Sequence, residues 1–197
     1  WANTFVVVTS DHGYMLGEKR QFSKFALREV ALKVPLFIAG GGIAPQRVAD
    51  PVSLLDIFPT ICGLAGAAVP GLCEGQDLAP TLRGAGPPPR GIAVSYYGGR
   101  RRNTAEGTET FRLHSTVRTA KWRLIDYGPA RHPLRRMLEL GAREAELYDH
   151  DPESPGYDPH EWHNLADEHP DVVAELRALL PPPAVYTLPA EVRSNQD

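Results

Sequence analysis

One uninterrupted apolar run near the start of the chain constrains the fold most. The run FVVV (residues 5–8) consists only of β-forming residues, and the polar tetrapeptide SDHG (residues 10–13) follows almost at once. A run of this kind is typical of a strand that is buried on both faces of a parallel sheet. We therefore expect an α/β fold in which Phe5–Thr9 is an interior parallel strand. Ligands of such sheets bind beyond the carboxyl ends of the strands, and Asp11 and His12 lie there.

The Asp11–His12 pair has two possible roles. A carboxylate and an imidazole at the end of a strand can together hold a divalent metal ion. Alternatively, Asp11 could cap the next element, and His12 could be a hydrogen-bonded turn residue. These two residues alone leave both interpretations open.

The pattern after this turn continues the α/β arrangement. We expect a helix over residues 25–32 and a second buried strand over residues 36–39. Ser53 or Asp56 is a suitable cap for a further helix that starts near Asp56, because Pro59 fits only a first helical turn. Gly66 is a suitable residue to end that helix.

The rest of the chain predicts a smaller α+β part. A short strand over residues 92–97 lies among Pro- and Gly-rich segments, and residues 114–119 and 121–127 form an expected hairpin. A strand at residues 147–148 and a helix that begins at Pro170 or Asp171 follow. We accordingly divide the chain into the C-terminal part of a catalytic α/β domain (1–84), a linker or loop region (85–110), a small α+β subdomain (111–180) and an extended tail (181–197).

Charge and composition exclude several classes of protein. The formal net charge is −3, so the chain lacks the basic balance of a nucleic-acid-binding protein, and we expect no nucleic-acid partner. No apolar run approaches the ~20 residues that span a bilayer, so we expect no membrane span. Two cysteines do not make a disulfide framework.

Motifs along the chain resemble the sulfatase family of the alkaline phosphatase superfamily. Asp-His-Gly (11–13) precedes Leu-Gly-Glu (16–18), Lys24 and Val-Pro-Leu (34–36), and LLDIFPTI (54–61) resembles a family helix start. RTAKWRLI (118–125) resembles a family strand, and ELYD (146–149), DPE (151–153) and NLA (164–166) resemble the closing signature of the family. The resemblance covers most of residues 5–180, and the order and spacing of the motifs make it specific. It implies an alkaline phosphatase-like fold, including part of the main mixed sheet.

The resemblance also implies roles for individual residues. Asp11 matches an aspartate that binds the catalytic divalent metal, and His12 stands where relatives have Asn or His facing that metal. Ca²⁺ is the expected ion, with Mn²⁺ or Mg²⁺ as alternatives. An all-oxygen shell suits Ca²⁺ or Mg²⁺, whereas the imidazole of His12 shifts the preference towards Mn²⁺ or Zn²⁺. Lys24 matches a catalytic lysine that contacts the sulfate and the leaving oxygen. Tyr14 and Phe25 could line the leaving-group pocket, or they could pack in the core.

One expected motif is missing. Sulfatases carry their nucleophile, a formylglycine, in Cys-x-Pro-x-Arg or Ser-x-Pro-x-Arg, and neither Cys62 nor Cys73 lies in such a motif. We therefore expect a C-terminal portion of a longer sulfatase that is inactive alone. Its partners would be the missing N-terminal part and a small-molecule or carbohydrate sulfate ester. Any signal peptide would lie in that missing part, so the compartment stays open.

Two other functions compete with this one at the level of sequence. A phosphonate monoester or phosphodiester hydrolase of the same superfamily would share the Asp-His-Gly turn and the following lysine. A non-catalytic interaction module would need neither of them. An upstream Cys-x-Pro-x-Arg motif would favour the enzymes.

Overall fold

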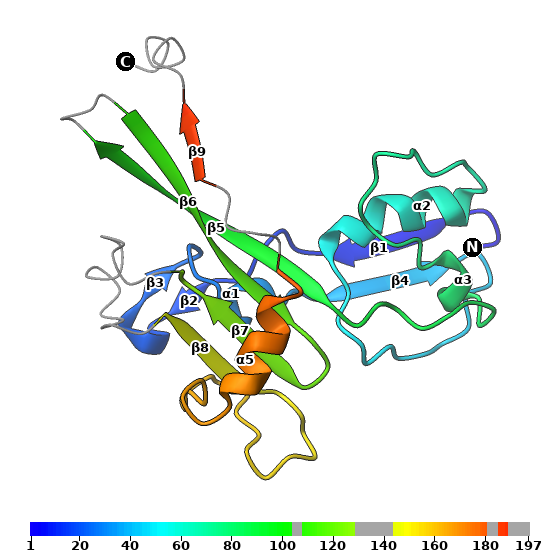
Figure 1. Cartoon of the computed structure of the whole chain (residues 1–197). Coiled ribbons are helices and arrows are strands. Elements are labelled where there is room, and N and C mark those ends of the chain that lie inside the picture. Colours follow the sequence, from blue (N-terminus) through cyan, green and yellow to red (C-terminus); the bar gives the residue numbers. More distant parts are fainter. Residues whose placement is uncertain (104–107, 129–143, 181–184, 189–197) are drawn as a thin grey trace.

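The computed structural model describes residues 1–103, 108–128, 144–180 and 185–188 (Figure 1). A two-stranded sheet with α2 and α3 forms one end of the molecule, and a larger antiparallel sheet forms the other. The β2–β3 hairpin and α1 lie against the larger sheet. Within the described ranges, no helix has the length and apolar character needed to cross a membrane.

Strand β1 (Phe5–Thr9) pairs with β4 (Leu36–Gly40), and the two run antiparallel. The expectation of an interior parallel strand is therefore wrong for this chain, because β4 is the only partner of β1 among the described residues. An apolar run predicts burial but does not encode the direction of the neighbouring strand. Val8 pairs with Phe37 on a face that is bare, since both side chains are more than half exposed.

The segment between these strands contains a hairpin and one short helix. Strands β2 (Met15–Leu16) and β3 (Phe22–Ser23) flank the 3₁₀ turn η1 (Glu18–Arg20), and α1 covers only Glu29–Leu32. The helix expected over residues 25–32 is therefore mostly absent. Arg28 adopts an extended conformation (φ −99°, ψ 157°) and lies at the amino end of α1. Its buried ion pairs, described below, outweigh its helix propensity.

The helix predicted near Asp56 is confirmed. The 3₁₀ turn η2 (Leu54–Asp56) leads into α2 (Ile57–Ala65), and Ser53 and Asp56 form a capping box. Gly66 ends the helix in the left-handed conformation, at φ 71°. The short helix α3 (Ala79–Leu82) follows.

The larger sheet has five strands. The order is β5 (Ala93–Asn103), β6 (Thr108–Arg118), β7 (Trp122–Asp126) and β8 (Ala145–Asp149), and β9 (Val185–Leu188) also pairs with β6. The predicted hairpin is confirmed as β6–β7. Strand β5 lies within residues 85–110, the region that we expect to be a linker or loop. In the tail, residues 185–188 form a strand, and the other tail residues lie outside the described ranges.

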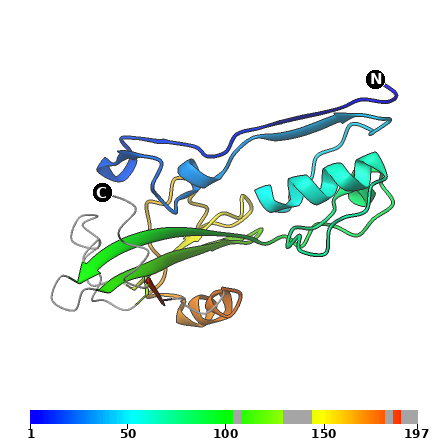
Figure 2. The same cartoon turned by 90° about the horizontal axis from the view of Figure 1, so that it is seen from above.

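Two hydrophobic clusters lie on opposite faces of this sheet. On one face, α5 (Pro170–Arg177) packs Val173 and Leu176 against Val117, Leu124 and Leu147. On the other face, Leu27 packs with Ile125, Tyr127 and Tyr148. Successive residues of a strand point to opposite faces, which explains why neighbours in β7 and β8 belong to different clusters. The sheet therefore lies between α5 and the segment that leads into α1 (Figure 2).

Candidate functional site

The Asp11–His12 turn lies directly after β1, as the sequence predicts. The Asp11 Oδ1 atom accepts a hydrogen bond from the backbone N–H of His12 at 3.0 Å. The Ser10 hydroxyl donates to the His12 carbonyl at 2.9 Å. These local bonds fix the turn. They do not involve the second carboxylate oxygen, Asp11 Oδ2, and the Asp11 side chain is 84% exposed.

The geometry of this pair fits a shared cation. His12 Nδ1 lies 2.8 Å from the Gly13 carbonyl, which can only accept, so Nδ1 carries the proton. In the neutral ring, Nε2 then keeps its lone pair, and it lies 3.4 Å from Asp11 Oδ2. Metal–ligand distances of roughly 2.0–2.6 Å allow one ion to contact both atoms. A backbone carbonyl that orients the imidazole in this way is the usual support of a metal-binding histidine.

Gly13 holds this turn against α1. Its backbone N–H donates to the Ala31 carbonyl at 2.8 Å. A Cβ at this position would overlap the Val30 carbonyl oxygen and lie 3.1 Å from the Val30 carbonyl carbon. Only glycine fits here, because the two backbones are in direct contact.

Lys24 follows β3 at the open end of the hairpin. The register pairs Met15 with Ser23 and Leu16 with Phe22. One further step of that register would place Lys24 opposite Tyr14, two residues after His12. Opposed residues of an antiparallel pair have Cβ atoms about 4.5–5.5 Å apart. This register supports a common site for Lys24 and the Asp11–His12 turn, which remains a prediction.

Tyr14 and Phe25 lie on the surface of the described chain. Tyr14 is 49% exposed and Phe25 is 58% exposed, so neither is a core residue here. The Phe25 ring lies 5.8 Å from the Tyr97 ring, and the Lys24 ammonium lies 5.8 Å from the Phe25 ring. Lys24 and two aromatic rings therefore gather on one surface, which suits a sugar or aryl group.

An open pocket of about 490 Å³ borders Asp11. Its walls come from the end of β1 and from the start of α2; the lining residues are Thr9, Ser10, Asp11, Leu54, Ile57, Phe58 and Ile61. Phe58 and Ile61 are each about half exposed, although both are large and apolar. Surface of this kind commonly marks an interface.

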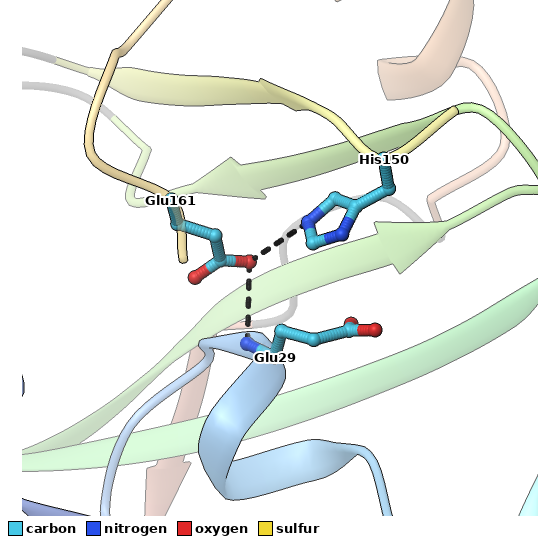
Figure 3. Close-up of side chains that lie close together, drawn as sticks. All are labelled: Glu29, His150 and Glu161. Carbon is cyan, nitrogen blue, oxygen red and sulfur yellow. Dashed lines mark hydrogen bonds and ion pairs between the residues drawn. The ribbon is translucent and has the colours of Figure 1, made fainter. Parts of the chain in front are cut away.

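A second group of acidic and histidine side chains lies within the molecule. Atoms of Glu29, His150 and Glu161 lie within 4.8 Å of one another (Figure 3). Glu161 Oε1 is 3.3 Å from His150 Nε2, and it accepts the backbone N–H of Glu29 at 3.2 Å. Spacing alone would allow a metal ion here.

Arginine side chains already satisfy the carboxylates of this group. Glu29 pairs with Arg123 and Arg118, and Glu161 lies 3.0 Å from Arg123 Nε and 3.8 Å from Arg28. Arg28 also lies 2.7 Å from Glu146. We call these six residues the buried ion-pair network: Arg28, Glu29, Arg118, Arg123, Glu146 and Glu161. The three carboxylates of this network balance its three guanidinium groups. The cluster of Glu29, His150 and Glu161 therefore does not fit a metal ion.

Burial and ion pairing shift the pKa values of Glu29, Arg28 and Arg118 within the network. Burial alone would raise the pKa of Glu29, but Arg123 and Arg118 outweigh it and lower the pKa to about 2. Burial would also lower the pKa of Arg28, yet Glu146 raises that pKa above its usual value. The charged forms of Glu29 and Arg28 are therefore favoured at neutral pH. Burial has the opposite effect on Arg118 and lowers the pKa of that guanidinium, although Glu29 offsets part of the shift.

Sequence reasoning did not identify this network. Its members lie far apart in the chain: Glu29 and Arg123 are 94 positions apart, and Arg28 and Glu146 are 118 positions apart. Glu161 is buried and pairs with Arg123 and Arg28, although it lies in a loop outside the motifs. Single charged residues in a sequence usually indicate a solvated surface, so the sequence carries no signal for the pairing.

Comparison with known proteins gives consistent matches. The model of the Sulfatase family matches residues 1–67. "Arylsulfatase K" of Danio rerio is 34% identical over 183 residues, which cover 90% of this chain and 30% of that protein. The solved structure of a 2-O GAG sulfatase is 31% identical with a TM-score of 0.66, and the match covers 90% of this chain and 35% of that one.

A third match carries a ligand. A structure described as being in complex with its substrate, D-glucosamine-2-N,6-O-disulfate, is 28% identical, with a TM-score of 0.60. It covers 91% of this chain and 33% of that one. The chain thus spans about a third of the length of the proteins it matches. These matches confirm the resemblance to sulfatases and the fold class, and they make the chain homologous to a portion of a sulfatase.

Proposed function

We propose that this chain is the C-terminal portion of a sulfatase, a hydrolase that converts sulfate monoesters to an alcohol and sulfate. The observation that carries the proposal is the pair formed by Asp11 Oδ2 and His12 Nε2, 3.4 Å apart at the edge of an open pocket. The homology to sulfatases supports it. The same homology favours sulfate esters over phosphonate esters and over a non-catalytic module.

Asp11 and His12 would hold a divalent metal ion. Ca²⁺ is the first candidate, and Mn²⁺ or Mg²⁺ are alternatives; of these ions, Mn²⁺ best accepts the nitrogen ligand of His12, whereas Ca²⁺ and Mg²⁺ prefer oxygen ligands. When bound, such an ion neutralises oxygens of the transferring group and lowers the pKa of the attacking hydroxyl. Two ligands do not fill a coordination shell, so the remaining ones would come from the N-terminal part of the enzyme.

Lys24 would act on the leaving group. Its ammonium would offset the negative charge that develops on the ester oxygen as the S–O bond breaks. Phe25 and Tyr14 would present apolar faces to the alcohol portion, which we expect to be a small molecule or a carbohydrate. The sulfated sugar bound to one structural relative supports a carbohydrate.

The N-terminal part of the enzyme would provide the nucleophile, a formylglycine in the family that this chain resembles. It would also cover the bare face that carries Val8 and Phe37 and the exposed Phe58 side chain in the pocket beside Asp11. Burial of a large apolar side chain stabilises a complex by roughly 1.5–3 kcal/mol. This surface is therefore well suited to a permanent interface within one enzyme.

The test is steady-state kinetics of the full-length protein on 4-nitrophenyl sulfate and on an aryl phosphonate monoester. Lys24→Ala should lower kcat and kcat/KM together by about 10²–10³-fold, because the contact strengthens only in the transition state. Lys121→Ala, an exposed lysine in the β6–β7 turn, is the matched control and should change neither value. An unchanged kcat in Lys24→Ala would remove Lys24 from the mechanism, and faster turnover of the phosphonate would overturn the proposed reaction.

A further inference from the structure

We propose that the buried ion-pair network is a positioning device for the candidate active site. It fixes α1 to the C-terminal sheet, and α1 in turn fixes the Asp11–His12 turn and the segment that carries Lys24. Glu29 is the central positioning residue. The role assigned to that turn rests on the proposed function, whereas the mechanical linkage does not.

Helix α1 cannot set its own position. It has four residues, and isolated helices shorter than about 12–15 residues are marginal in water. Its amino end is held twice by the C-terminal sheet and the loop after it. The Glu29 carboxylate pairs with Arg118 and Arg123, and the Glu29 backbone N–H donates to Glu161 Oε1 at 3.2 Å.

The other end of α1 holds the candidate metal turn. The Ala31 carbonyl accepts the Gly13 N–H at 2.8 Å, one residue away from His12. The missing side chain of Gly13 lets the two backbones touch, so no flexible side chain intervenes. A displacement of α1 would therefore move Gly13, and His12 with it.

The segment before α1 holds Lys24 in the same way. Arg28 donates to Glu146 at 2.7 Å and to the Tyr148 hydroxyl at 3.1 Å, and both acceptors lie on β8. Leu27 is buried in the cluster beside them. Lys24 lies three residues earlier, and its carbonyl accepts the N–H of Ala26 in a tight turn at 2.9 Å.

Charge explains why this linkage would give precision more than stability. Buried ion pairs often contribute little net stability, because desolvation of the charges offsets their attraction. Removing one partner is costly, however, because it leaves an uncompensated buried charge. The pairs therefore tolerate few alternative positions of α1, which is what a site needs when catalysis depends on placement within about 0.5 Å.

The experiment compares Glu29→Gln with Leu176→Ala in the full-length protein. Leu176 lies in the cluster under α5, on the opposite face of the sheet, and has no described contact with α1. Its loss destabilises the fold without touching the network. Three quantities are measured for each variant: hydrogen exchange of the Gly13 N–H, affinity for Mn²⁺ by calorimetry, and kcat and KM on 4-nitrophenyl sulfate.

We expect Glu29→Gln to accelerate Gly13 exchange by at least about tenfold. It should weaken Mn²⁺ binding about 10–100-fold, as loss of a supporting contact does at metal sites. It should also lower kcat about 10²-fold with KM within about threefold. Leu176→Ala should lower the Tm without these three changes. Should Glu29→Gln not fold, Arg118→Gln removes one of the two cations on Glu29 and is measured in its place.

The outcomes separate the two proposals. Gly13 exchange equal to wild type in a folded network variant, or equally accelerated in Leu176→Ala, would overturn the positioning role. Faster Gly13 exchange in a protein whose wild type hydrolyses no sulfate ester would support the linkage and refute the proposed function.

Discussion

Replacement of Gly13 by alanine should damage both stability and activity, because the site leaves no space for a methyl group. The new Cβ would lie 3.1 Å from the Val30 carbonyl carbon and 3.3 Å from Ala31 Cα, with the Val30 oxygen closer still. Carbon atoms at optimal separation lie ~3.5–4.0 Å apart. To relieve the overlap, the turn must retreat from α1 by about 1 Å, which takes the 2.8 Å hydrogen bond to Ala31 beyond bonding range.

Two costs add in this variant. The lost backbone hydrogen bond costs about 1 kcal/mol, and overpacking costs roughly 1–3 kcal/mol, so we expect the free energy of unfolding to fall by about 2–4 kcal/mol. A shift of about 1 Å in the site should also lower kcat by about 10²-fold. Urea unfolding and steady-state kinetics measure these effects in the full-length protein. Gly71→Ala is the control, because a Cβ there would meet nothing within 4 Å. Equal unfolding midpoints and equal kcat in the two variants would refute the close-contact argument.

Three further predictions concern pH, the bare surface and the isolated chain. The folded pKa of Glu29 is about 2 against a usual 4.5, so ionised Glu29 favours the folded state by about 3 kcal/mol relative to its protonated form; this difference is complete above pH ~5 and is lost as the pH falls towards 2. Urea unfolding from pH 7 to 2 should therefore show a steeper loss of stability in the wild type than in Glu29→Gln, whose remaining slope comes from other carboxyls such as Asp158, whose pKa is also lowered; equal slopes would contradict the pairing of Glu29. Phe37→Lys should reduce self-association of the isolated chain, measured by light scattering, because it places a charge on the bare β1–β4 face. Leu72→Lys, in an exposed loop, is the control and should not reduce it. Equal scattering by the two variants would mean that the β1–β4 face does not mediate self-association. The isolated chain should hydrolyse neither aryl sulfates nor phosphonate monoesters. It should also bind divalent metal ions weakly, because two ligands do not complete a coordination shell. Turnover by the purified chain would contradict the need for an N-terminal part.

Local signals in the sequence predicted most of the elements. Residues close together in the chain set the apolar runs of β1 and β4, the capping box of η2 at Ser53, the end of α2 at Gly66 and the β6–β7 hairpin. The antiparallel direction of β1 could not be predicted, because a doubly apolar strand looks the same in either direction. The helix expected from residue 25 failed because Arg28 is drawn into distant ion pairs.

The candidate site shows the same contrast between residues that are adjacent in the sequence and residues that are far apart in it. Asp11 and His12 are adjacent, so a motif was enough to single them out, and the hairpin register supports Lys24 as a neighbour. The roles proposed for these residues remain predictions. The arginines and glutamates that hold α1 come from three distant segments, and no spacing in the sequence brings them together.

The ion-pair network also has a consequence for folding kinetics. Its contacts join residues 94, 118 and 132 positions apart, so each one closes a long loop of chain. The entropy of loop closure must be lost before such contacts stabilise anything, and contacts of this kind tend to form late. Substitutions in the network should then accelerate unfolding while they leave the refolding rate nearly unchanged. The turn that carries Asp11, although it is among the first segments of this chain to be synthesised, would be among the last to reach its final place.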